Sequence, residues 1–244
     1  MLLDKKTCII TGAARGIGKE IALLFAAEGA SVYACDLEGS DFSWVQDYPS
    51  IIPRYVDVTD RSASKNLLTE IYKSESKIDI VINNAAIISN QRLGMISRDN
   101  LQQMFLVNVI AVIEWIQLAA RLMARTNGGS ILNMASITGV VGSPGQVAYS
   151  STKGAVITLT KSIAKELAPL NIRVNAIAPG IIKTERFGEL YETDGEKIDS
   201  RITKIGLGRL GSPEDIAQVC AFLSSDKANY ISGQVIGVDG CATI

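Results

Sequence analysis

Short runs of apolar, mostly β-branched residues alternate along the chain with longer segments in which apolar residues recur every three or four positions. The short runs predict strands, with approximate ranges 6–11, 31–36, 52–56, 79–83, 129–135, 172–177 and 234–238. The longer segments predict helices near 16–28, 61–75, 97–126, 149–168 and 213–224. This alternation is typical of a parallel sheet with helices on both faces. We therefore expect an α/β fold with a doubly wound sheet of about seven parallel strands.

No internal repeat, low-complexity tract or linker-like stretch divides the 244 residues, so we expect residues 1–244 to form one domain. Residues 181–210 interrupt the alternation with a polar, glycine-containing segment. Long connections are commonly binding loops, and this one follows the carboxyl end of a strand, where open α/β sheets bind ligands. We therefore expect a substrate lid near residues 181–210.

A glycine-rich turn links the first predicted strand to the first predicted helix. The sequence GAARGIG at residues 12–18 follows the apolar run TCIIT at residues 7–11. Glycines let a backbone approach a pyrophosphate closely, and a helix N-terminus supplies unpaired N–H groups with a favourable dipole. The combination predicts a Rossmann-type dinucleotide-binding fold. The residues expected at the cofactor in this turn are Gly12, Arg15, Gly16, Ile17 and Gly18.

The end of the second predicted strand bears on which dinucleotide binds. Asp36 stands there, and its carboxylate could accept hydrogen bonds from the ribose hydroxyls of NAD(H) while repelling the 2′-phosphate of NADP(H). Arg15 is a counter-signal, because a guanidinium could meet that phosphate. We give Asp36 more weight, since it should lie nearest the 2′ position. The expected cofactor is therefore NAD(H).

The composition argues against several other functions. With 24 basic and 25 acidic residues, the chain has no basic stripe for nucleic acid and no polybasic patch for a membrane. The N-terminus has no signal-like sequence, and the longest apolar stretch, 104–116, is too short to span a bilayer. The four cysteines are scattered without a C-x-x-C pair, which favours reduced thiols. We expect a soluble, cytoplasmic protein with no metal site and no nucleic-acid or membrane partner.

The chain contains no histidine, which excludes Ser-His-Asp and Cys-His nucleophile pairs within it. Tyr149 and Lys153 offer another acid/base pair, because their four-residue spacing puts both on one face of a predicted helix. Having the phenolate ready at pH 7 costs about 4 kcal/mol, and one ammonium at ~4 Å returns a similar amount. A Tyr/Lys pair can thus replace histidine in proton transfer.

Two further polar residues fall at informative places. Ser136 follows the predicted strand 129–135 and should lie at the carboxyl edge of the sheet, where ligands bind. Asn108 lies within the apolar helical run FLVNVI at residues 105–110. A buried amide there costs stability unless it is hydrogen-bonded, so Asn108 could be a buried backbone cap, a functional residue or both.

Together, these motifs resemble those of the short-chain dehydrogenase/reductase family. The resemblance runs from residues 11–18 through 83–86 and the four polar residues above to 179–180 and 237–240. It implies a catalytic tetrad made of Asn108, Ser136, Tyr149 and Lys153. In that tetrad Tyr149 exchanges a proton with the substrate oxygen and Ser136 hydrogen-bonds the same oxygen. Lys153 lowers the tyrosine pKa and holds the nicotinamide ribose, while Asn108 anchors a water on the proton path.

The resemblance also implies further cofactor contacts along the carboxyl edge of the sheet. Besides the glycine-rich turn and Asp36, the implied cofactor residues are Asp57, Val58, Asn84, Ala85, Tyr149, Lys153, Pro179, Gly180, Ile182 and Thr184. The leading hypothesis is therefore an NAD(H)-dependent oxidoreductase that interconverts a small-molecule secondary alcohol and a ketone by hydride transfer.

Two alternatives remain open. The chain also resembles the 3-oxoacyl-[acyl-carrier-protein] reductases of this family, which usually take NADPH and dock an acidic carrier protein through basic residues. Asn127 and Leu170 stand at those docking positions here, which counts against that activity. The other alternative is a dinucleotide-sensing protein without catalysis, against which the intact Tyr149/Lys153 pair argues.

The helix predicted near 101–125 is apolar on more than one face, with only a narrow polar stripe at Glu114, Gln117 and Arg121. A helix covered on its sheet side alone should show a broader polar face. Loops of the same subunit or a second subunit could provide the extra covering. The family resemblance implies that the helices bearing Asn108 and Tyr149 pair across subunits, so we expect a homotetramer.

Overall fold

The computed structural model describes residues 1–185, 187 and 202–242. Within this part of the chain, seven strands form one sheet in the order β3-β2-β1-β4-β5-β6-β7, and all neighbouring strands are parallel. The strands are β1 (Thr7–Thr11), β2 (Ser31–Asp36), β3 (Ile51–Tyr55), β4 (Ile80–Asn83), β5 (Gly129–Met134), β6 (Ile172–Pro179) and β7 (Val235–Val238). The predicted doubly wound, Rossmann-type sheet is confirmed.

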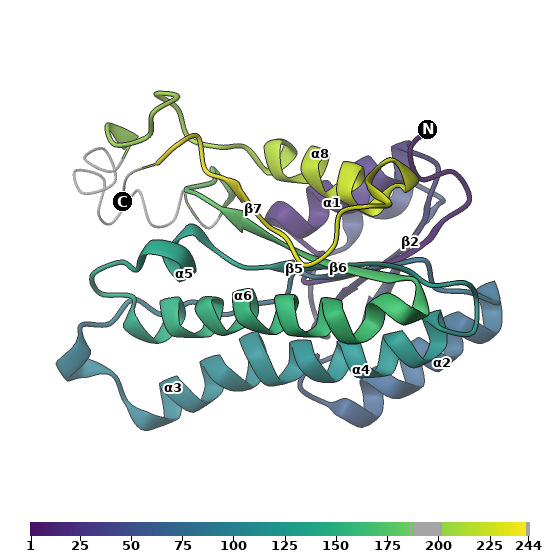
Figure 1. Cartoon of the computed structure of the whole chain (residues 1–244), viewed down its shortest axis with the longest axis horizontal. Helices are drawn as coiled ribbons and strands as arrows, with labels where there is room; N and C mark the ends of the chain where they lie inside the picture. Colours follow the sequence, from purple (N-terminus) through teal and green to yellow (C-terminus); the bar gives the residue numbers. More distant parts are fainter. Residues whose placement is uncertain (186, 188–201, 243–244) are drawn as a thin grey trace.

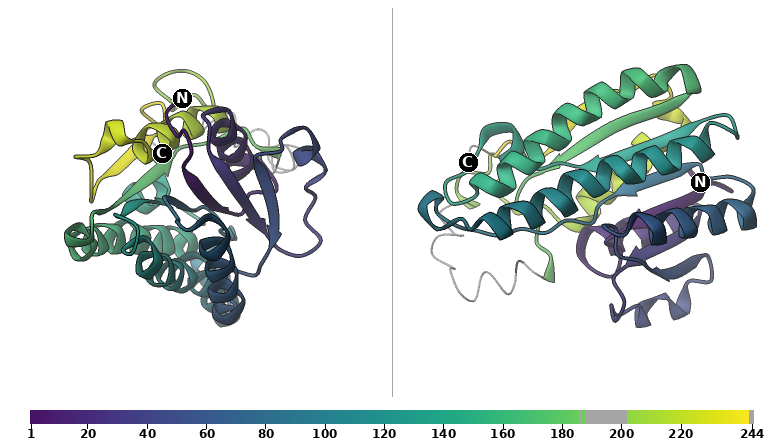
Figure 2. Two further views of the ribbon diagram at one scale, coloured as in Figure 1. Left: turned by 90° about the vertical axis from the view of Figure 1, so that its right-hand side faces the viewer. Right: turned by 90° about the horizontal axis from the view of Figure 1, so that it is seen from below.

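Helices cover both faces of the sheet (Figure 1). One layer contains α1 (Gly16–Ala27) and α8 (Pro213–Ser224). The opposite layer contains α2 (Arg61–Glu75), α4 (Ala111–Met123) and α6 (Val147–Leu167). The end view in Figure 2 shows the strands between these two layers. The expectation of helices on both faces is therefore also confirmed.

The first strand shows why its sequence is apolar throughout. All five residues of β1 are buried. Cys8 and Ile10 belong to the apolar cluster that includes residues of α1 and α8, whereas Ile9 belongs to the cluster that includes residues of α2 and α4. Successive side chains of a strand point to opposite faces, so a strand covered on both sides needs apolar residues at every position.

The single helix expected over 97–126 has three parts. It begins with α3 (Arg98–Phe105), where the Ser97 hydroxyl accepts a hydrogen bond from the backbone N–H of Asn100 at 3.1 Å. A π-helical turn, η3 (Leu106–Ile110), then leads into α4. Such turns are rare and occur often at functional sites. This one contains Asn108, whose hydrogen bonds are described below.

Among the α-helices whose bounds lie in the described residues, the sequence interpretation lacks one. Helix α5 (Ile137–Val141) has only five residues, ITGVV, and their β-branched composition gives no helical periodicity. It forms because Ser136 caps it from the end of β5. The 3₁₀ turns of the described chain are η1 (Ser43–Asp47), η2 (Leu93–Met95), η4 (Ala168–Leu170) and η5 (Asp226–Ala228).

The continuous helical run Arg98–Met123 is 26 residues long and apolar enough, by length and composition, to cross a membrane. It is longer than the apolar stretch 104–116 seen in the sequence because the helical run also includes residues 98–103 and 117–123. Half of its most apolar window is buried inside the protein, and Trp115 and Met123 join the same apolar cluster as the strand residues Ile9 and Val81. A core helix meets the same length test, and we interpret α4 as one.

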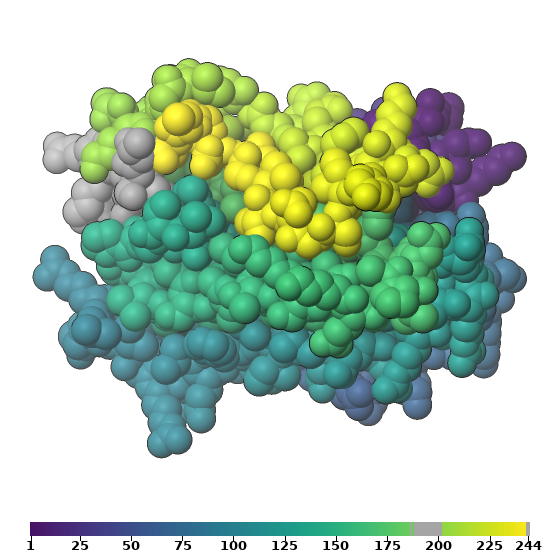
Figure 3. Space-filling model, in the orientation of Figure 1, coloured from purple at the N-terminus to yellow at the C-terminus, as the bar shows by residue number. Residues whose placement is uncertain are grey.

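The C-terminal strand continues into a segment that lies against the residues before α8. Figure 3 shows the yellow C-terminal residues on the surface between α6 and the α8 layer. The N–H of Leu207 donates to the carbonyl of Gly240 at 2.9 Å, and Ile205 and Ala242 form an antiparallel bridge. Residues 205–207 are thus held to residues 240–242.

A row of buried polar side chains joins two strands to α6. Asn83 Nδ2 donates to Asn133 Oδ1 at 2.8 Å, and Asn133 Nδ2 donates to Thr160 Oγ1 at 2.9 Å. Thr160 in turn donates to the carbonyl of Val156 at 2.7 Å. Buried polar groups cost stability unless they are paired, so this row fixes α6 against β4 and β5.

We predict that Thr160→Val lowers the free energy of unfolding by about 1–3 kcal/mol, because it leaves the buried amide of Asn133 without its acceptor. Urea unfolding measures this change. Thr158→Val is the matched control: Thr158 is exposed on the same helix and donates only to the carbonyl of Gly154, at 3.4 Å. Equal effects of the two substitutions would contradict the prediction.

Candidate active site

The glycine-rich turn connects β1 to α1 at the carboxyl edge of the sheet. Gly16 has a φ of +58°, a left-handed conformation that side chains other than glycine rarely adopt. A Cβ atom on Gly18 would lie 2.1 Å from the carbonyl oxygen of Gly12, so the first turn of α1 packs too closely on the loop for any other residue. The predicted glycines therefore set the backbone path of the loop.

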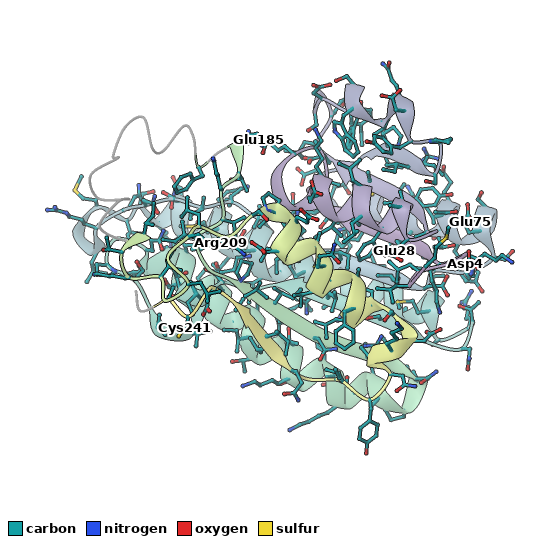
Figure 4. The ribbon with its side chains drawn as sticks, turned by 90° about the horizontal axis from the view of Figure 1, so that it is seen from above. Asp4, Glu28, Glu75, Glu185, Arg209 and Cys241 are labelled. Carbon is teal, nitrogen blue, oxygen red and sulfur yellow. The ribbon has the colours of Figure 1, made fainter. Side chains whose placement is uncertain are left out.

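Helix α1 has no side-chain cap from its own sequence. Arg15 occupies the N-cap position in an extended conformation and makes no cap hydrogen bond. Instead, Glu185 Oε2 accepts a hydrogen bond from the N–H of Gly16 at 3.1 Å. Figure 4 shows Glu185 on the segment that follows β6, beside the N-terminal part of the chain. A carboxylate oxygen is thus held where a helix N-terminus favours an anion, so the site fits a phosphate of a dinucleotide.

A cleft of about 480 Å³ opens beside this loop. Ten of the cofactor residues expected from the sequence line it: Gly12, Arg15, Gly16, Ile17, Asp36, Asp57, Val58, Asn84, Ala85 and Thr184. The lining residues that sequence reasoning missed are Leu37, Val56, Ala86, Ile87, Gln103, Val107 and Glu185. Leu37, Val56, Ala86 and Glu185 directly follow or precede an expected cofactor residue, whereas Ile87, Gln103 and Val107 do not.

Hydrogen bonds between the ends of β1 and β4 hold the floor of the cleft. The Thr11 hydroxyl oxygen accepts from the N–H groups of Asn84 at 3.0 Å and Ala85 at 3.1 Å. The Asn84 side-chain amide donates to the carbonyls of Thr11 at 3.0 Å and Gly12 at 2.8 Å. Both amide hydrogens of Asn84 are therefore engaged on the loop, and Asn84 shapes the cleft instead of offering a free donor to it.

Asp36 lies at the end of β2 and lines the cleft. One carboxylate oxygen accepts from the N–H of Ala14 at 2.9 Å, and the other accepts from the N–H of Leu37 at 2.9 Å. Each oxygen keeps a further lone pair, because a carboxylate can accept about four hydrogen bonds. Asp36 can thus bind the loop and a ribose hydroxyl together.

Six expected cofactor residues are not in the lining of this cleft, namely Gly18, Tyr149, Lys153, Pro179, Gly180 and Ile182. Pro179 ends β6, and Gly180 donates its N–H to the carbonyl of Val238 at 3.0 Å. Ile182 lines a second cavity of about 390 Å³ that also contains Asp239. Pro179 and Gly180 thus join β6 to β7 at the sheet edge. Within the expected lid at 181–210, residues 186 and 188–201 lie outside the described part of the chain.

Lys153 lies on α6 and is only 3% exposed. Its Nζ donates to the carbonyl of Met134 at the end of β5, at 2.7 Å, and lies 5.7 Å from the centroid of the Tyr149 ring. Burial lowers the pKa of Lys153 from 10.5 to about 8, because desolvation disfavours the charged form. The amine is still mostly protonated at pH 7. The structure therefore brings a charged ammonium next to Tyr149, as the spacing predicts.

Ser136 is two residues past Met134, the last residue of β5, and so lies at the carboxyl edge of the sheet, as predicted. Its hydroxyl accepts from the N–H of Thr138 at 3.2 Å and lies 3.0 Å from the Thr138 hydroxyl. Helix α5, which it caps, packs directly on α6, since a Cβ atom on Gly139 would lie 2.7 Å from the backbone carbon of Lys153. This packing brings the Ser136 turn against the helix that carries Tyr149.

Asn108 is fully buried in the π-helical turn. Its Oδ1 accepts from the N–H of Ile87 at 2.9 Å, and its Nδ2 donates to the carbonyl of Ile87 at 2.8 Å and to the Thr152 hydroxyl at 3.1 Å. Thr152 lies between Tyr149 and Lys153 on α6 and was missed in the sequence. Asn108 thus links the segment after β4 to the helix that carries both residues.

Comparison with known proteins places this geometry in a family. A family model described as enoyl-(acyl carrier protein) reductase matches residues 12–243. A 3-oxoacyl-[acyl-carrier-protein] reductase of Thermotoga maritima is 41% identical over 245 residues, covering 98% of each chain. A reductase of the same name from Aquifex aeolicus is 38% identical, covering 98% of this chain and 97% of its own.

A relative named for a different activity matches almost as well. A 3α-hydroxysteroid dehydrogenase of Mediterraneibacter gnavus is 37% identical, over 99% of this chain and 98% of its own. These full-length matches include the glycine-rich turn, the strands that follow it and the residues of α6. The chain therefore belongs to the short-chain dehydrogenase/reductase family of oxidoreductases.

Proposed function

We propose that the protein reduces the 3-oxo group of an acyl thioester, with Tyr149 as the proton donor. The buried ammonium of Lys153 beside the Tyr149 ring is the observation that carries the chemistry. The substrate class rests on the full-length similarity to proteins named 3-oxoacyl-[acyl-carrier-protein] reductase. This substrate was the alternative in the sequence interpretation, and the relatives support it better than a general alcohol dehydrogenase.

A reduced nicotinamide, when bound, supplies the hydride that adds to the carbonyl carbon. The carbonyl π bond breaks as the hydride arrives, and the oxygen takes a proton from the Tyr149 hydroxyl. Lys153 stabilises the phenolate that remains, because its ammonium lies beside the ring in a desolvated setting. In our assignment Ser136 donates a hydrogen bond to the same oxygen and orients it.

Asn108 has a positioning role in this proposal. The family resemblance implies that Asn108 anchors a water on the proton path, and because both hydrogens of its side-chain amide are engaged, this amide would not donate to that water. We therefore assign to Asn108 the alignment of Ile87 with Thr152, which keeps α6 in register with the end of β4. A water that relays protons would bind to other groups, such as backbone carbonyls freed by the π-helical turn.

The cofactor would lie along the cleft from Asp36 to Tyr149. The N–H groups at the start of α1 would hold the pyrophosphate, and the free lone pairs of Asp36 would accept from the adenosine ribose. Because a carboxylate repels a 2′-phosphate, we propose NADH as the preferred reductant, with Arg15 as the residue that would favour NADPH.

A second candidate is an NAD(H)-dependent dehydrogenase of a small alcohol or ketone. Asp36 supports it, and so do two uncharged residues at the carrier-docking positions. Asn127 and Leu170 lie in the loops before β5 and β6, where Asn171 Nδ2 donates to the carbonyl of Asn127 at 2.8 Å. These two side chains themselves supply no positive charge to attract an acidic carrier protein.

We also propose a homotetramer in the cytoplasm. Ile110 at the start of α4 is 47% exposed, Phe222 on α8 is 41% exposed and Tyr230 is fully exposed. Exposed apolar side chains on both helical layers are consistent with more than one contact between subunits. Cys8, Cys35 and Cys220 are buried free thiols, as expected in a reducing compartment.

The purified protein should oxidise NADH when given a 3-oxoacyl thioester, followed by the loss of nicotinamide absorbance. Tyr149→Phe should bind NADH normally and lower turnover about 10²- to 10⁴-fold, since it removes the proton donor. Tyr48→Phe makes the same change at an exposed position outside the cleft and should leave turnover unchanged. Turnover by Tyr149→Phe at the wild-type rate would refute the assignment.

The same assay separates the two candidate substrates. Sugars, hydroxy acids and cyclic alcohols are tested with NAD⁺ beside the thioester with NADH. Faster turnover of one of these alcohols than of any 3-oxoacyl thioester would favour the second candidate.

We predict that kcat/KM is about tenfold or more higher with NADH than with NADPH, because Asp36 hydrogen-bonds a ribose and repels a phosphate. Asp36→Asn should narrow this preference, since it removes the charge and keeps an acceptor for Ala14. Asp41→Asn, on the exposed turn that follows, is the matched control. A wild-type preference for NADPH would show that Arg15 outweighs Asp36.

Lys153 should also make the free energy of unfolding depend on pH. Its pKa is about 8 in the folded state against 10.5 for a free lysine, so the unfolded chain binds more protons between these values and stability rises with pH across that window. Relative to Lys153→Met, the wild type should gain about 3 kcal/mol from pH 7 to 10.5. Denaturant unfolding over this range measures the difference, and a constant difference would contradict a buried, titrating ammonium.

A further inference from the structure

The carboxylate on the N-terminus of α1 comes from a distant part of the chain. Glu185 is 169 residues from Gly16, whose N–H it accepts at 3.1 Å. Glu185 stands at the start of a short helical turn in which the N–H of Phe187 donates to the carbonyl of Thr184 at 3.0 Å. The N–H of Thr184 donates to the carbonyl of Ile182, also at 3.0 Å. The carboxylate is therefore presented by backbone that has its own hydrogen bonds.

The same turn lies directly over the glycine-rich loop. A Cβ atom on Gly16 would lie 3.5 Å from the Thr184 methyl carbon and 3.8 Å from Glu185 Oε2. Both residues also line the cleft of about 480 Å³ together with Arg15 and Asp36. The turn thus covers the part of the cleft at which a pyrophosphate would reach α1.

The Glu185 carboxylate and a pyrophosphate cannot both bind the N-terminus of α1. Only the first N–H groups of α1 are free of partners within the helix, and Glu185 occupies one of them. The pyrophosphate of a dinucleotide carries two negative charges, which would lie next to the carboxylate. Like charges so close raise the free energy of the pair, so one of the two must leave.

We propose that Glu185 competes with the pyrophosphate of the cofactor for the N-terminus of α1. Cofactor binding then requires the carboxylate to leave Gly16, which releases the turn at Thr184 and Glu185 from the glycine-rich loop. This inference rests on the proposed use of a dinucleotide. It makes Glu185 a determinant of cofactor affinity that acts on NADH and NADPH alike, because it acts at the pyrophosphate and not at the 2′ position.

The test is calorimetric titration of the full-length protein with NADH, ADP-ribose and adenosine. Glu185→Gln keeps the size of the side chain and removes its charge, so ADP-ribose and NADH should bind about two- to fivefold more tightly, the effect of one charge at a helix N-terminus. Adenosine has no phosphate and should bind equally to both proteins. Glu166→Gln, an exposed glutamate on α6, is the matched control and should leave all three affinities unchanged.

A melting experiment gives an independent measure. Glu185→Gln without ligand should melt at a slightly lower temperature than the wild type, because α1 loses its anion, and saturating ADP-ribose should raise its melting temperature more than that of the wild type. Equal or weaker binding of ADP-ribose by Glu185→Gln, or an equal gain for adenosine, would overturn the inference and leave the proposed function intact. A wild type that binds no dinucleotide at all would overturn both.

Discussion

A lysine ammonium buried at the end of a strand determines how the site is laid out. Lys153 is 3% exposed, and its hydrogen bond of 2.7 Å to the carbonyl of Met134 offsets part of the cost of its desolvation. Because Met134 ends β5, this bond sets the height of α6 above the sheet edge. Farther along α6, the bond from Asn133 to Thr160 holds the same register. These two hydrogen bonds, from Lys153 to Met134 and from Asn133 to Thr160, together set the position of Tyr149 on α6.

The other half of the site depends on a helix that starts without a cap of its own. The N-terminus of α1 has free N–H groups, and the chain supplies a carboxylate from the segment after β6 to satisfy one of them. The segment expected to cover the substrate is thereby tied to the loop expected to hold the cofactor. Binding of a ligand to the segment after β6 should therefore change the affinity of the glycine-rich loop for the cofactor, and the reverse, because the hydrogen bond between Gly16 and Glu185 has to break.

The fold and the acid/base residues constrain the substrate less than they constrain the type of reaction. Relatives with a 3-oxoacyl reductase name and a hydroxysteroid dehydrogenase name are similar to this chain over nearly its whole length. Fold and acid/base groups therefore do not select between their substrates. The neutral Asn127 and Leu170 bear on the choice of substrate, whereas the charge of Asp36 bears on the choice of cofactor.

The sequence by itself determined the alternation of strands and helices, the glycine-rich turn and the pairing of Tyr149 with Lys153, because each of these depends on residues close together in the chain. Only the tertiary structure decided that Asn108 bonds Ile87 and Thr152, that Gly139 packs on Lys153 and that Glu185 meets Gly16. These contacts join positions far apart in sequence, and no local periodicity or spacing encodes them. They arise when parallel strands bring their carboxyl ends, and the loops that follow, to one edge of the sheet.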